Sequence, residues 1–231
     1  MNGSRWQRFT GRVRHGLLAQ EILDRLGKIG LLCQPYIVTF EACGLVPAPP
    51  APDNCSVRPL NPGDADSIAA VGHRRRTAEQ IHLELQDMRC YGAFLEQRLI
   101  GYTWVNLRYV PVVYRGGELF AIASDEAYLF DMFIDPAHRG LRIAPWLRVQ
   151  VLAALANEGR VRCYSLSLLL NRSSRLFKAR LGAQEREWRL SLQVGLGPLR
   201  GIDLRLARRG EPLRTPTLLT RPPWRAHHAT E

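Results

Sequence analysis

The feature that most restricts the fold is a strand that runs through a short turn directly into a helix. Residues 127–134 are a nearly continuous apolar run, as in a strand buried on both faces. The stretch DPAHRGLR follows at 135–142, and apolar residues then recur at three- and four-residue steps over 143–157, which predicts a helix. Pro145 fits this helix because a proline in the first turn needs no N–H, so we expect the helix to begin within 141–144.

The turn has the chemistry of an anion site. The first N–H groups of a helix have no partner inside the helix, and the helix dipole favours negative charge at that end. Gly140 lets the backbone come close to a ligand. We therefore predict that main-chain N–H groups at this corner bind a pyrophosphate.

Further segments surround this unit in a regular order. We predict a strand near 56–60, helices capped near Asp64 and over 77–88, a hairpin over 90–107 with its tip at 96–98, a strand at 162–170, a helix at 172–181, and strands at 185–194 and 201–207. The order is strand, two helices, three strands, helix, strand, helix and two strands. This order predicts an α/β (α+β) domain.

The two ends of the chain differ from this central part. Residues 12–32 have the pattern of an amphipathic helix, which either lies on an anionic membrane through its basic start or packs on the domain. A strand is expected at 36–42 and a proline-rich linker at 46–54. We divide the chain into 1–54 (helix, strand and linker), 55–207 (main domain) and 208–231 (flexible tail).

The net charge of +11 does not indicate a nucleic-acid surface. Residues 1–30 carry a net +4 and residues 201–231 a net +3, so the central part keeps only +4. All but two of the 32 basic residues are arginine, a bias typical of a GC-rich coding sequence. We therefore expect no nucleic acid among the partners.

The five cysteines are odd in number and widely separated, with no C-x-x-C pair and no metal-like grouping with histidine. They read as reduced thiols, so we expect a cytoplasmic protein without a metal. No apolar run is long enough to span a bilayer, and the first thirty residues lack the pattern of a signal peptide.

A second signature follows on the helix after the 162–170 strand, in the stretch NRSSRLFKARLGA at 171–183. Together with IDPAHRGLRIA at 134–144, it resembles the GNAT superfamily of N-acetyltransferases over about 56–207. The resemblance implies a mixed, mostly antiparallel sheet of about seven strands flanked by about four helices and splayed between the fourth and fifth strands. It implies that acetyl-coenzyme A is bound by Met132, Phe133, Ile134, Arg139, Gly140, Leu141, Arg142, Ile143, Ala144, Asn171, Ser174 and Phe177.

Four positions depart from the family pattern. Ala137 stands where Gln or Arg opens the first signature, and Arg142 replaces its second glycine. We expect Arg142 in αR geometry with its amide turned inward and its side chain on the phosphates, the alternative being a side chain that swings clear. Lys178 replaces the tyrosine that often protonates the departing thiolate, and Ala183 replaces an aromatic residue.

A carboxylate lies inside the otherwise apolar 127–134 strand. Period-two alternation places Asp131 on one face with Leu129 and Phe133. Burying Asp131 without a partner is costly, so it is either the base or the group that orients the acceptor amine, or a structural residue bound to backbone or an arginine. Glu126, just before the strand, is the reserve base.

The sequence therefore predicts an enzyme that moves an acetyl or short acyl group from coenzyme A to a primary amine by direct transfer. Two alternatives stay open: an acyl carrier protein as the donor, and a non-catalytic acyl-coenzyme A binding module. The expected partners are the acyl donor and an amine acceptor, with peripheral membrane contact through residues 5–32 and a homodimer as further options. The acceptor is not indicated by the sequence.

Overall fold

The computed structural model describes residues 31–45, 49–72, 76–111, 118–194, 201–208 and 217–219, together with residues 23, 25 and 26. The chain separates into two compact units. The first contains residues 1–40, 111–120 and 166–231, and the second contains residues 41–110 and 121–165. Strands β1 (Leu31–Ala42) and β8 (Arg162–Leu168) each contribute residues to both units, and we describe each unit by itself.

The second unit has a mixed sheet with the strand order β8-β7-β4-β3-β2. Its strands are β2 (Cys55–Leu60), β3 (Arg89–Leu95), β4 (Arg98–Asn106) and β7 (Glu126–Ile134), and the start of β8. All neighbours are antiparallel except β7 and β8, which run parallel. The hairpin and the apolar strand predicted from the sequence are therefore confirmed.

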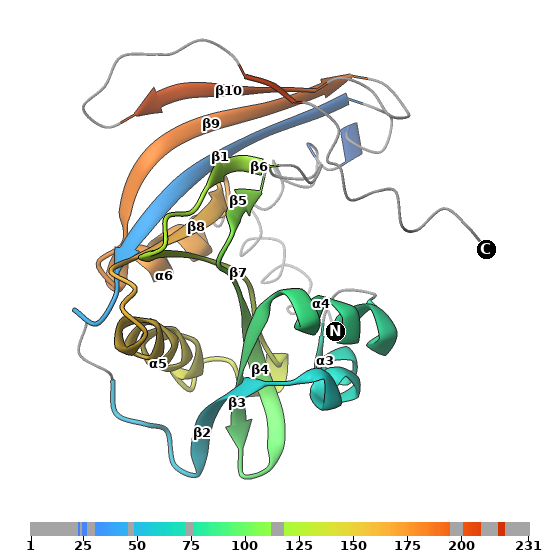
Figure 1. Cartoon of the computed structure of the whole chain (residues 1–231), viewed down its shortest axis with the longest axis vertical. Helices are drawn as coiled ribbons and strands as arrows, with labels where there is room; N and C mark the ends of the chain where they lie inside the picture. The colour runs from blue at the N-terminus through green and yellow to red at the C-terminus, as the bar shows by residue number, and fades with distance from the viewer. Residues whose placement is uncertain are drawn as a thin grey trace, which may run out of the picture. The chain divides into compact units, whose positions relative to one another are not determined.

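Helices cover both faces of this sheet (Figure 1). Helix α5 (Ile143–Asn157) packs on one face, in a cluster that includes Ala127, Leu129 and Ile134 of β7. Helices α3 (Ala65–Val71) and α4 (Ala78–Asp87) pack on the other face, in a cluster with Tyr102 and Trp104. Helix α5 begins within the interval that Pro145 predicted.

The starts of the two short helices are fixed by local hydrogen bonds. Thr77 caps α4 in a capping box with Gln80, each side chain accepting from the other residue's N–H. A 3-10 turn (Pro62–Asp64) with a capping box of its own precedes α3, and Asp64 is the N-cap residue of α3. The predicted N-cap position of α3 is therefore confirmed, although the Asp64 side chain makes no cap hydrogen bond to that helix.

The first unit has an antiparallel sheet with the order β11-β10-β9-β1. Its further elements are α6 (Arg172–Arg180), β9 (Gln184–Val194), β10 (Gly201–Arg208) and β11 (Thr217–Leu219). Strand β11 lies in the segment predicted to be a flexible tail, where its main chain pairs with β10. The short strands β5 (Tyr109–Pro111) and β6 (Glu118–Ala121) were not predicted either.

The predicted amphipathic helix at 12–32 falls mostly outside the described residues. Its last two positions, Leu31 and Leu32, belong to strand β1 instead, because β1 extends its pairing with β9 as far as Leu31. The observed strand β1 is thus five residues longer than the strand predicted at 36–42. Among the described helices, none combines the length and apolarity needed to cross a bilayer.

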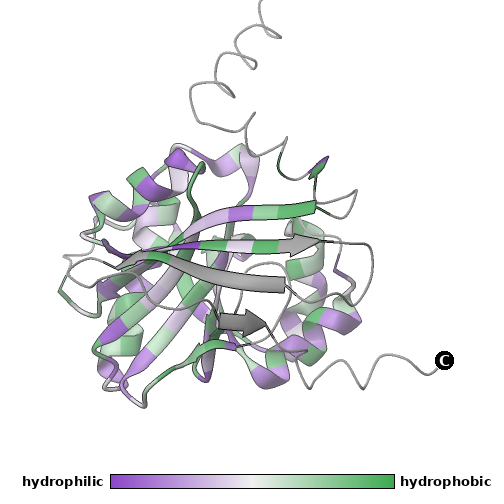
Figure 2. Ribbon diagram, turned by 90° about the horizontal axis from the view of Figure 1, so that it is seen from above, coloured by the Kyte–Doolittle hydropathy of each residue, from purple (hydrophilic) through white to green (hydrophobic). Residues whose placement is uncertain are grey.

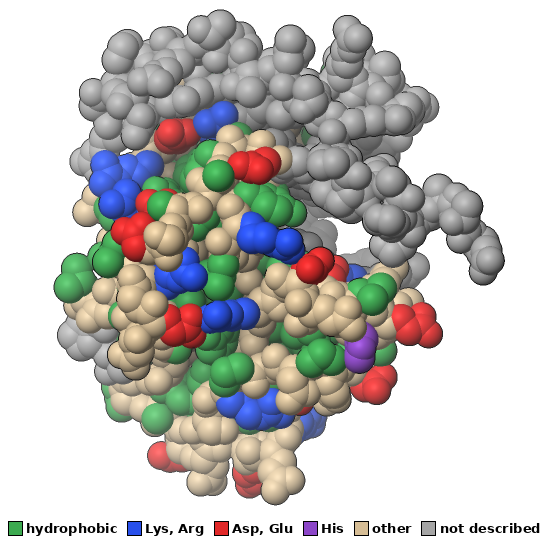
Figure 3. All heavy atoms as spheres, in the orientation of Figure 1, with side chains coloured by type: hydrophobic (Ala, Val, Ile, Leu, Met, Phe, Trp, Pro, Cys, Tyr) green, Lys and Arg blue, Asp and Glu red, His purple; other side chains and the backbone are tan. Residues whose placement is uncertain are grey.

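Polar and apolar residues alternate along the helices and strands in Figure 2. Basic and acidic side chains are interspersed on the face drawn in Figure 3. Several of them form ion pairs, such as Arg58 with Asp64, whose atoms lie 2.7 Å apart. That pair lowers the pKa of the Asp64 carboxyl, and it fixes the end of β2 against the turn that leads into α3.

Candidate functional site

Strand β7 contains a bulge at the acidic residue predicted to take part in the chemistry. Tyr102 of β4 is opposite Phe133, and Trp104 is opposite Phe130, so two residues of β7 face one residue of β4. Asp131 has φ +47°, a left-handed conformation that Asp tolerates better than most residues. The strand therefore bends at Asp131.

The bulge overturns the predicted assignment of β7 side chains to faces. Leu129 packs on the α5 side, as period-two alternation requires, but Phe133 packs on the α3–α4 side and Ile134 on the α5 side. Because one extra residue is inserted, every side chain after the bulge changes face. Asp131 and Phe133 therefore do not share a face with Leu129.

Asp131 meets an arginine from the loop before α4. Arg76 Nη2 donates to Asp131 Oδ2 over 2.5 Å, and Arg76 Nη1 donates to Glu84 Oε2 over 2.6 Å. The Asp131 side chain is only 2% exposed. Burial lowers the pKa of the Arg76 guanidinium, but Glu84 and Asp131 raise it and the net shift is upward. This is the arginine partner foreseen in the structural alternative for Asp131.

The Asp131 carboxylate also affects the aromatic core beside it. Burial, reinforced by the negative charge of Asp131, raises the pKa of Tyr102 to about 12. Arg76 lies 5.3 Å from the centre of the Trp104 ring, a distance suited to a cation–π contact. Tyr102 and Trp104 are fully buried, so both rings belong to the packed core.

Strand β7 pairs with β8 over only three residues. The parallel register joins Glu126, Ala127 and Tyr128 to residues 162–164. From Leu129 onward, no described strand pairs with this edge of β7. The main-chain groups of the predicted thioester-binding residues, Met132 to Ile134, thus lie on a strand with one open edge, beyond a bulge.

The turn after β7 is built by an aspartate and two left-handed residues. The carboxylate of Asp135 accepts from the N–H of Ala137 over 3.0 Å, and this bond lowers the pKa of Asp135. Gly140 has φ +86°, with no atom near the place that a Cβ would take, so the position needs glycine for its φ and not for space. Arg142 has φ +60° and ψ +14°.

The conformation of Arg142 corrects our expectation of αR geometry at this position. The family's second glycine fits a backbone with positive φ, and Arg142 adopts that backbone in spite of its Cβ, at about 1 kcal/mol or more of strain. Leu141, between Gly140 and Arg142, has negative φ. Alternation of the sign of φ turns successive N–H groups toward a common centre, which is an anion-binding concavity.

The amides of this turn have no acceptor among the described residues. The N–H groups of Gly140, Leu141, Arg142, Ile143 and Ala144 take part in no hydrogen bond there. Helix α5 has 15 residues, so its dipole is fully developed at this end. All five are residues that the sequence predicted to bind the pyrophosphate.

Two arginines flank these amides. Arg139 is anchored to the strand end, because its Nε donates to the carbonyl oxygen of Ile134 over 3.2 Å and its guanidinium lies 5.8 Å from the Phe133 ring. Arg142 is exposed, and its side chain makes no cap hydrogen bond to α5. The corner therefore combines free N–H groups with positive charge and faces solvent.

Glu126 lies at the opposite end of β7 from this turn. Eight residue steps separate it from Ile134, roughly 26 Å along a strand. Its carboxylate accepts from the Tyr164 hydroxyl over 2.8 Å and pairs with Arg162 at 3.2 Å. Its assignment as reserve base stays a prediction.

The second signature lies in the first unit, on α6. Asn171 is the N-cap residue, and its side-chain oxygen accepts from the N–H of Ser174 over 3.1 Å. Ser174 Oγ lies 3.2 Å from Ser167 Oγ, Phe177 is half-buried, and Gly182 ends the helix with φ +79°. Asn171 and Gly182 thus serve helix capping here, a structural use that the family pattern did not reveal.

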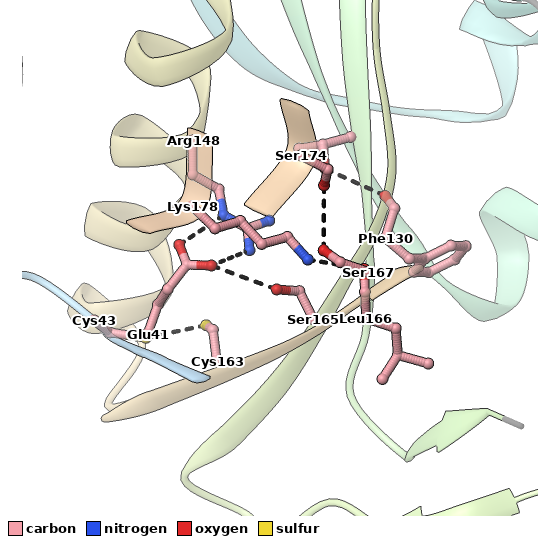
Figure 4. Close-up of polar contacts among 11 residues, drawn as sticks. Glu41, Cys43, Phe130, Arg148, Cys163, Ser165, Leu166, Ser167, Ser174 and Lys178 are labelled. Atoms are coloured by element: carbon pink, nitrogen blue, oxygen red, sulfur yellow. Dashed lines mark hydrogen bonds and ion pairs between the residues drawn. The ribbon is translucent and has the colours of Figure 1, made fainter. Parts of the chain in front are cut away.

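Lys178 replaces the family's tyrosine and is buried. Its Nζ donates to the carbonyl oxygen of Leu166 over 2.8 Å, as Figure 4 shows. The partner that the sequence analysis did not identify is Arg76. Arg76 and Asp131 are 55 residues apart, so no local sequence pattern links them. The only indication in the sequence is that a buried carboxylate needs a cation as its partner.

Solved structures with a similar fold were found. A Drosophila protein matches with a TM-score of 0.53 and 10% identity over 74% of this chain and 54% of that chain. A putative GNAT-family acetyltransferase from Novosphingobium aromaticivorans matches with a TM-score of 0.52 and 19% identity, over 71% of this chain and 66% of that chain. A GCN5-related N-acetyltransferase from Sphaerobacter thermophilus matches with a TM-score of 0.52 and 15% identity, over 75% of this chain and 55% of that chain. The match thus spans about half to two thirds of these solved chains, and no curated protein matches.

These similarities establish the fold, an α+β sheet protein of the GNAT type. The model of the acetyltransferase (GNAT) family matches residues 64–183, a range that contains β7, the five free amides of the turn, and the signature on α6. That range is more than half of the chain. The chain belongs to the GNAT family of acetyltransferases.

Proposed function

We propose that the protein transfers an acetyl or short acyl group from coenzyme A to a primary amine. The observation that carries this proposal is the row of five unpartnered amides, Gly140 to Ala144, at the start of α5. Such a row binds a diphosphate through directed N–H groups, and coenzyme A contains one. Arg139 and Arg142 add positive charge at the same corner.

The thioester end of the donor then extends along β7 toward the bulge. A main-chain N–H among Met132 to Ile134 donates to the thioester oxygen and stabilises the negative charge that develops there. The amine nitrogen attacks the carbonyl carbon, a C–N bond forms, the C–S bond breaks, and the thiolate leaves. Because a reference pKa of about 10 keeps the amine protonated at neutral pH, it first gives one proton to water so that its lone pair can attack. After the C–N bond has formed, the nitrogen loses a second proton, which the departing thiolate takes up directly or through water.

Asp131 acts in this proposal by position. The Asp131 carboxylate is paired with Arg76 at 2.5 Å and its side chain is almost fully buried, so the contact with the guanidinium holds it in place. Its pairing fixes the bulge, and the bulge sets the direction of the following N–H groups. Direct proton transfer to Asp131 stays a prediction, which the pH dependence of Asp131→Asn tests: a base loses the rising limb of kcat/KM, whereas a positioning residue keeps the limb at lower rate.

The decisive experiment is calorimetric titration of the full chain with coenzyme A and acetyl-coenzyme A, followed by acetyl transfer to amino sugars, amino acids and peptides. We expect binding by both donors and amine-dependent thiol release. Binding without turnover across the panel would favour the non-catalytic module. Absence of coenzyme A binding, with turnover supported by an acyl carrier protein, would favour the other donor.

A further inference from the structure

Two cysteine thiols far apart in the sequence are in contact inside the second unit. Cys43 follows the last residue of β1, and Cys163 is the second residue of β8. Their Sγ atoms lie 3.1 Å apart, although 120 positions separate them (Figure 4). Cys163 is fully buried, whereas Cys43 is 9% exposed. The remaining three cysteines form no such pair among the described residues.

The main chain around this pair is held in place. The N–H of Cys43 donates to the carbonyl oxygen of Val161 over 3.1 Å, which ties the two segments together beside the thiols. Gly44 has φ +74°, and a Cβ there would lie 3.1 Å from that of Ala156 on α5. A disulfide needs an S–S distance of about 2.05 Å, so side-chain rotations of roughly 1 Å at the sulfur atoms close the gap.

The surroundings make the two thiols unequal. The contact with the Cys163 thiol lowers the pKa of Cys43; burial and the negative charge of Glu41 oppose this effect, and the guanidinium of Arg148 adds to it. The same contact raises the pKa of Cys163, and burial adds to the rise. Arg148 is held beside them by Glu41, at 2.6 Å. Cys43 is thus the thiol that loses its proton more readily, and Cys163 is the thiol that attacks Cys43 once Cys43 is oxidised.

We propose that Cys43 and Cys163 are a modification site, a thiol pair that a peroxide oxidises to an intramolecular disulfide. The Cys43 thiolate attacks one oxygen of hydrogen peroxide, the O–O bond breaks, and the released hydroxide takes a proton to become water. The sulfur of Cys163 then attacks the Cys43 sulfenic acid, the S–O bond breaks, and the hydroxide leaves as water with the proton of Cys163. Two thiols and one peroxide give one disulfide and two waters.

The disulfide closes a loop that contains most of the second unit, including α5. A cross-link between positions so far apart restricts the unfolded chain strongly, so oxidation raises the resistance to unfolding. This consequence is independent of donor binding, because none of its readouts involves coenzyme A.

The test uses the full, reduced chain treated with one equivalent of hydrogen peroxide. The remaining thiols are alkylated in denaturant and the peptides are mapped by mass spectrometry. We expect a Cys43–Cys163 disulfide, a fall from five free thiols to three, and a rise in Tm of several degrees that dithiothreitol reverses. A matched control, C33S/C55S, removes the two half-buried thiols; it should keep the disulfide and the rise in Tm, and its free thiols should fall from three to one.

The variants C43S and C163S each abolish the disulfide and the rise in Tm. The proposal is overturned if the mapped wild-type chain carries its oxidation on Cys33, Cys55 or Cys90 while Cys43 and Cys163 are alkylated. It is equally overturned if Cys43 proceeds to sulfinic acid without a cross-link. Mapping of the wild-type chain decides the question even where a variant fails to fold.

Discussion

The two ends of helix α5 use the same backbone device for opposite purposes. At the C-terminal end, Gly159 has φ +82° and its N–H donates to the carbonyl oxygen of Ala156, while the N–H of Arg160 donates to that of Leu155. At the N-terminal end, Gly140 has φ +86°, but the five amides from Gly140 onward have no acceptor among the described residues. The main-chain N–H groups at the C-terminal end are hydrogen-bonded, whereas those at the N-terminal end have no acceptor among the described residues.

The difference shows which property marks a binding corner. A glycine with positive φ is shared by both ends and ends helices throughout proteins, so it does not identify a site. Free N–H groups, a strained arginine at the N-cap position and exposed positive charge occur together only at the N-terminal end of α5. The predictions below test whether changes at the N-terminal end of α5 affect coenzyme A binding, and whether changes at the C-terminal end affect stability alone.

The largest effect is expected from the middle of α5, which holds both ends in one rigid helix. Arg148 and Glu41 form an ion pair with side chains 3% and 1% exposed. Arg148→Ala removes the cation that compensates the buried Glu41 charge, so we expect the free energy of unfolding to fall by about 3–5 kcal/mol. Urea unfolding followed by circular dichroism measures the loss.

A double variant serves as the control for this prediction. Arg148→Met with Glu41→Leu replaces both charges by apolar groups of similar size, and we expect it to recover most of the lost stability. A single variant as stable as the wild-type chain would mean that Glu41 finds another partner, and that the ion pair does not hold the helix.

The second prediction compares the two glycines directly. Gly140 and Gly159 have nearly the same φ, and neither has an atom within 4 Å of the position of a Cβ. Gly140→Ala and Gly159→Ala should therefore lose a similar stability, roughly 1–2 kcal/mol. Only Gly140→Ala should raise the Kd for coenzyme A, by about tenfold, since it turns the amides away. Equal Kd values for the two variants would remove the pyrophosphate corner from the proposed function.

The sequence predicted local elements well because their causes are local. The period of the apolar residues predicted α5, and the helix predicted over 77–88 matches α4 to within a residue at each end. The glycine and helix start at 140–144 carried the anion-site prediction for the same reason. Each of these features depends on residues within one or two turns of chain.

Features that depend on distant partners were not predicted. The bulge at Asp131 requires the register of β4 and the guanidinium of Arg76, so alternation along β7 gave the wrong faces after it. The αL conformation of Arg142 is set by the path from β7 into α5, and an arginine has no preference that signals it. The contact of Cys43 with Cys163 likewise results from packing and not from spacing.

The third prediction concerns the charge at the open end of α5. If the Arg142 guanidinium contacts the phosphates, Arg142→Gly raises the Kd for coenzyme A by about three- to fivefold at low salt, and less in 0.5 M salt, because exposed charges are screened. Arg142→Lys keeps the charge and should bind nearly as well as wild type. Tighter binding by Arg142→Gly would show instead that the side chain swings clear and that relief of αL strain dominates.

The smallest effect is expected at the closed end of α5. Glu158 forms an ion pair with Arg89, and both side chains are more than a third exposed. Such a pair contributes about 0.2–1 kcal/mol, while an acidic side chain at a helix C-terminus loses a similar amount against the dipole. The two effects nearly cancel, so Glu158→Gln should change the free energy of unfolding by no more than about 0.5 kcal/mol, as measured by urea unfolding. It should leave the Kd for coenzyme A unchanged, because the N–H groups of Gly159 and Arg160 at this end are already hydrogen-bonded and cannot bind the donor. A Glu158→Gln variant with clearly weaker donor binding would mean that the two ends of α5 are not functionally separate.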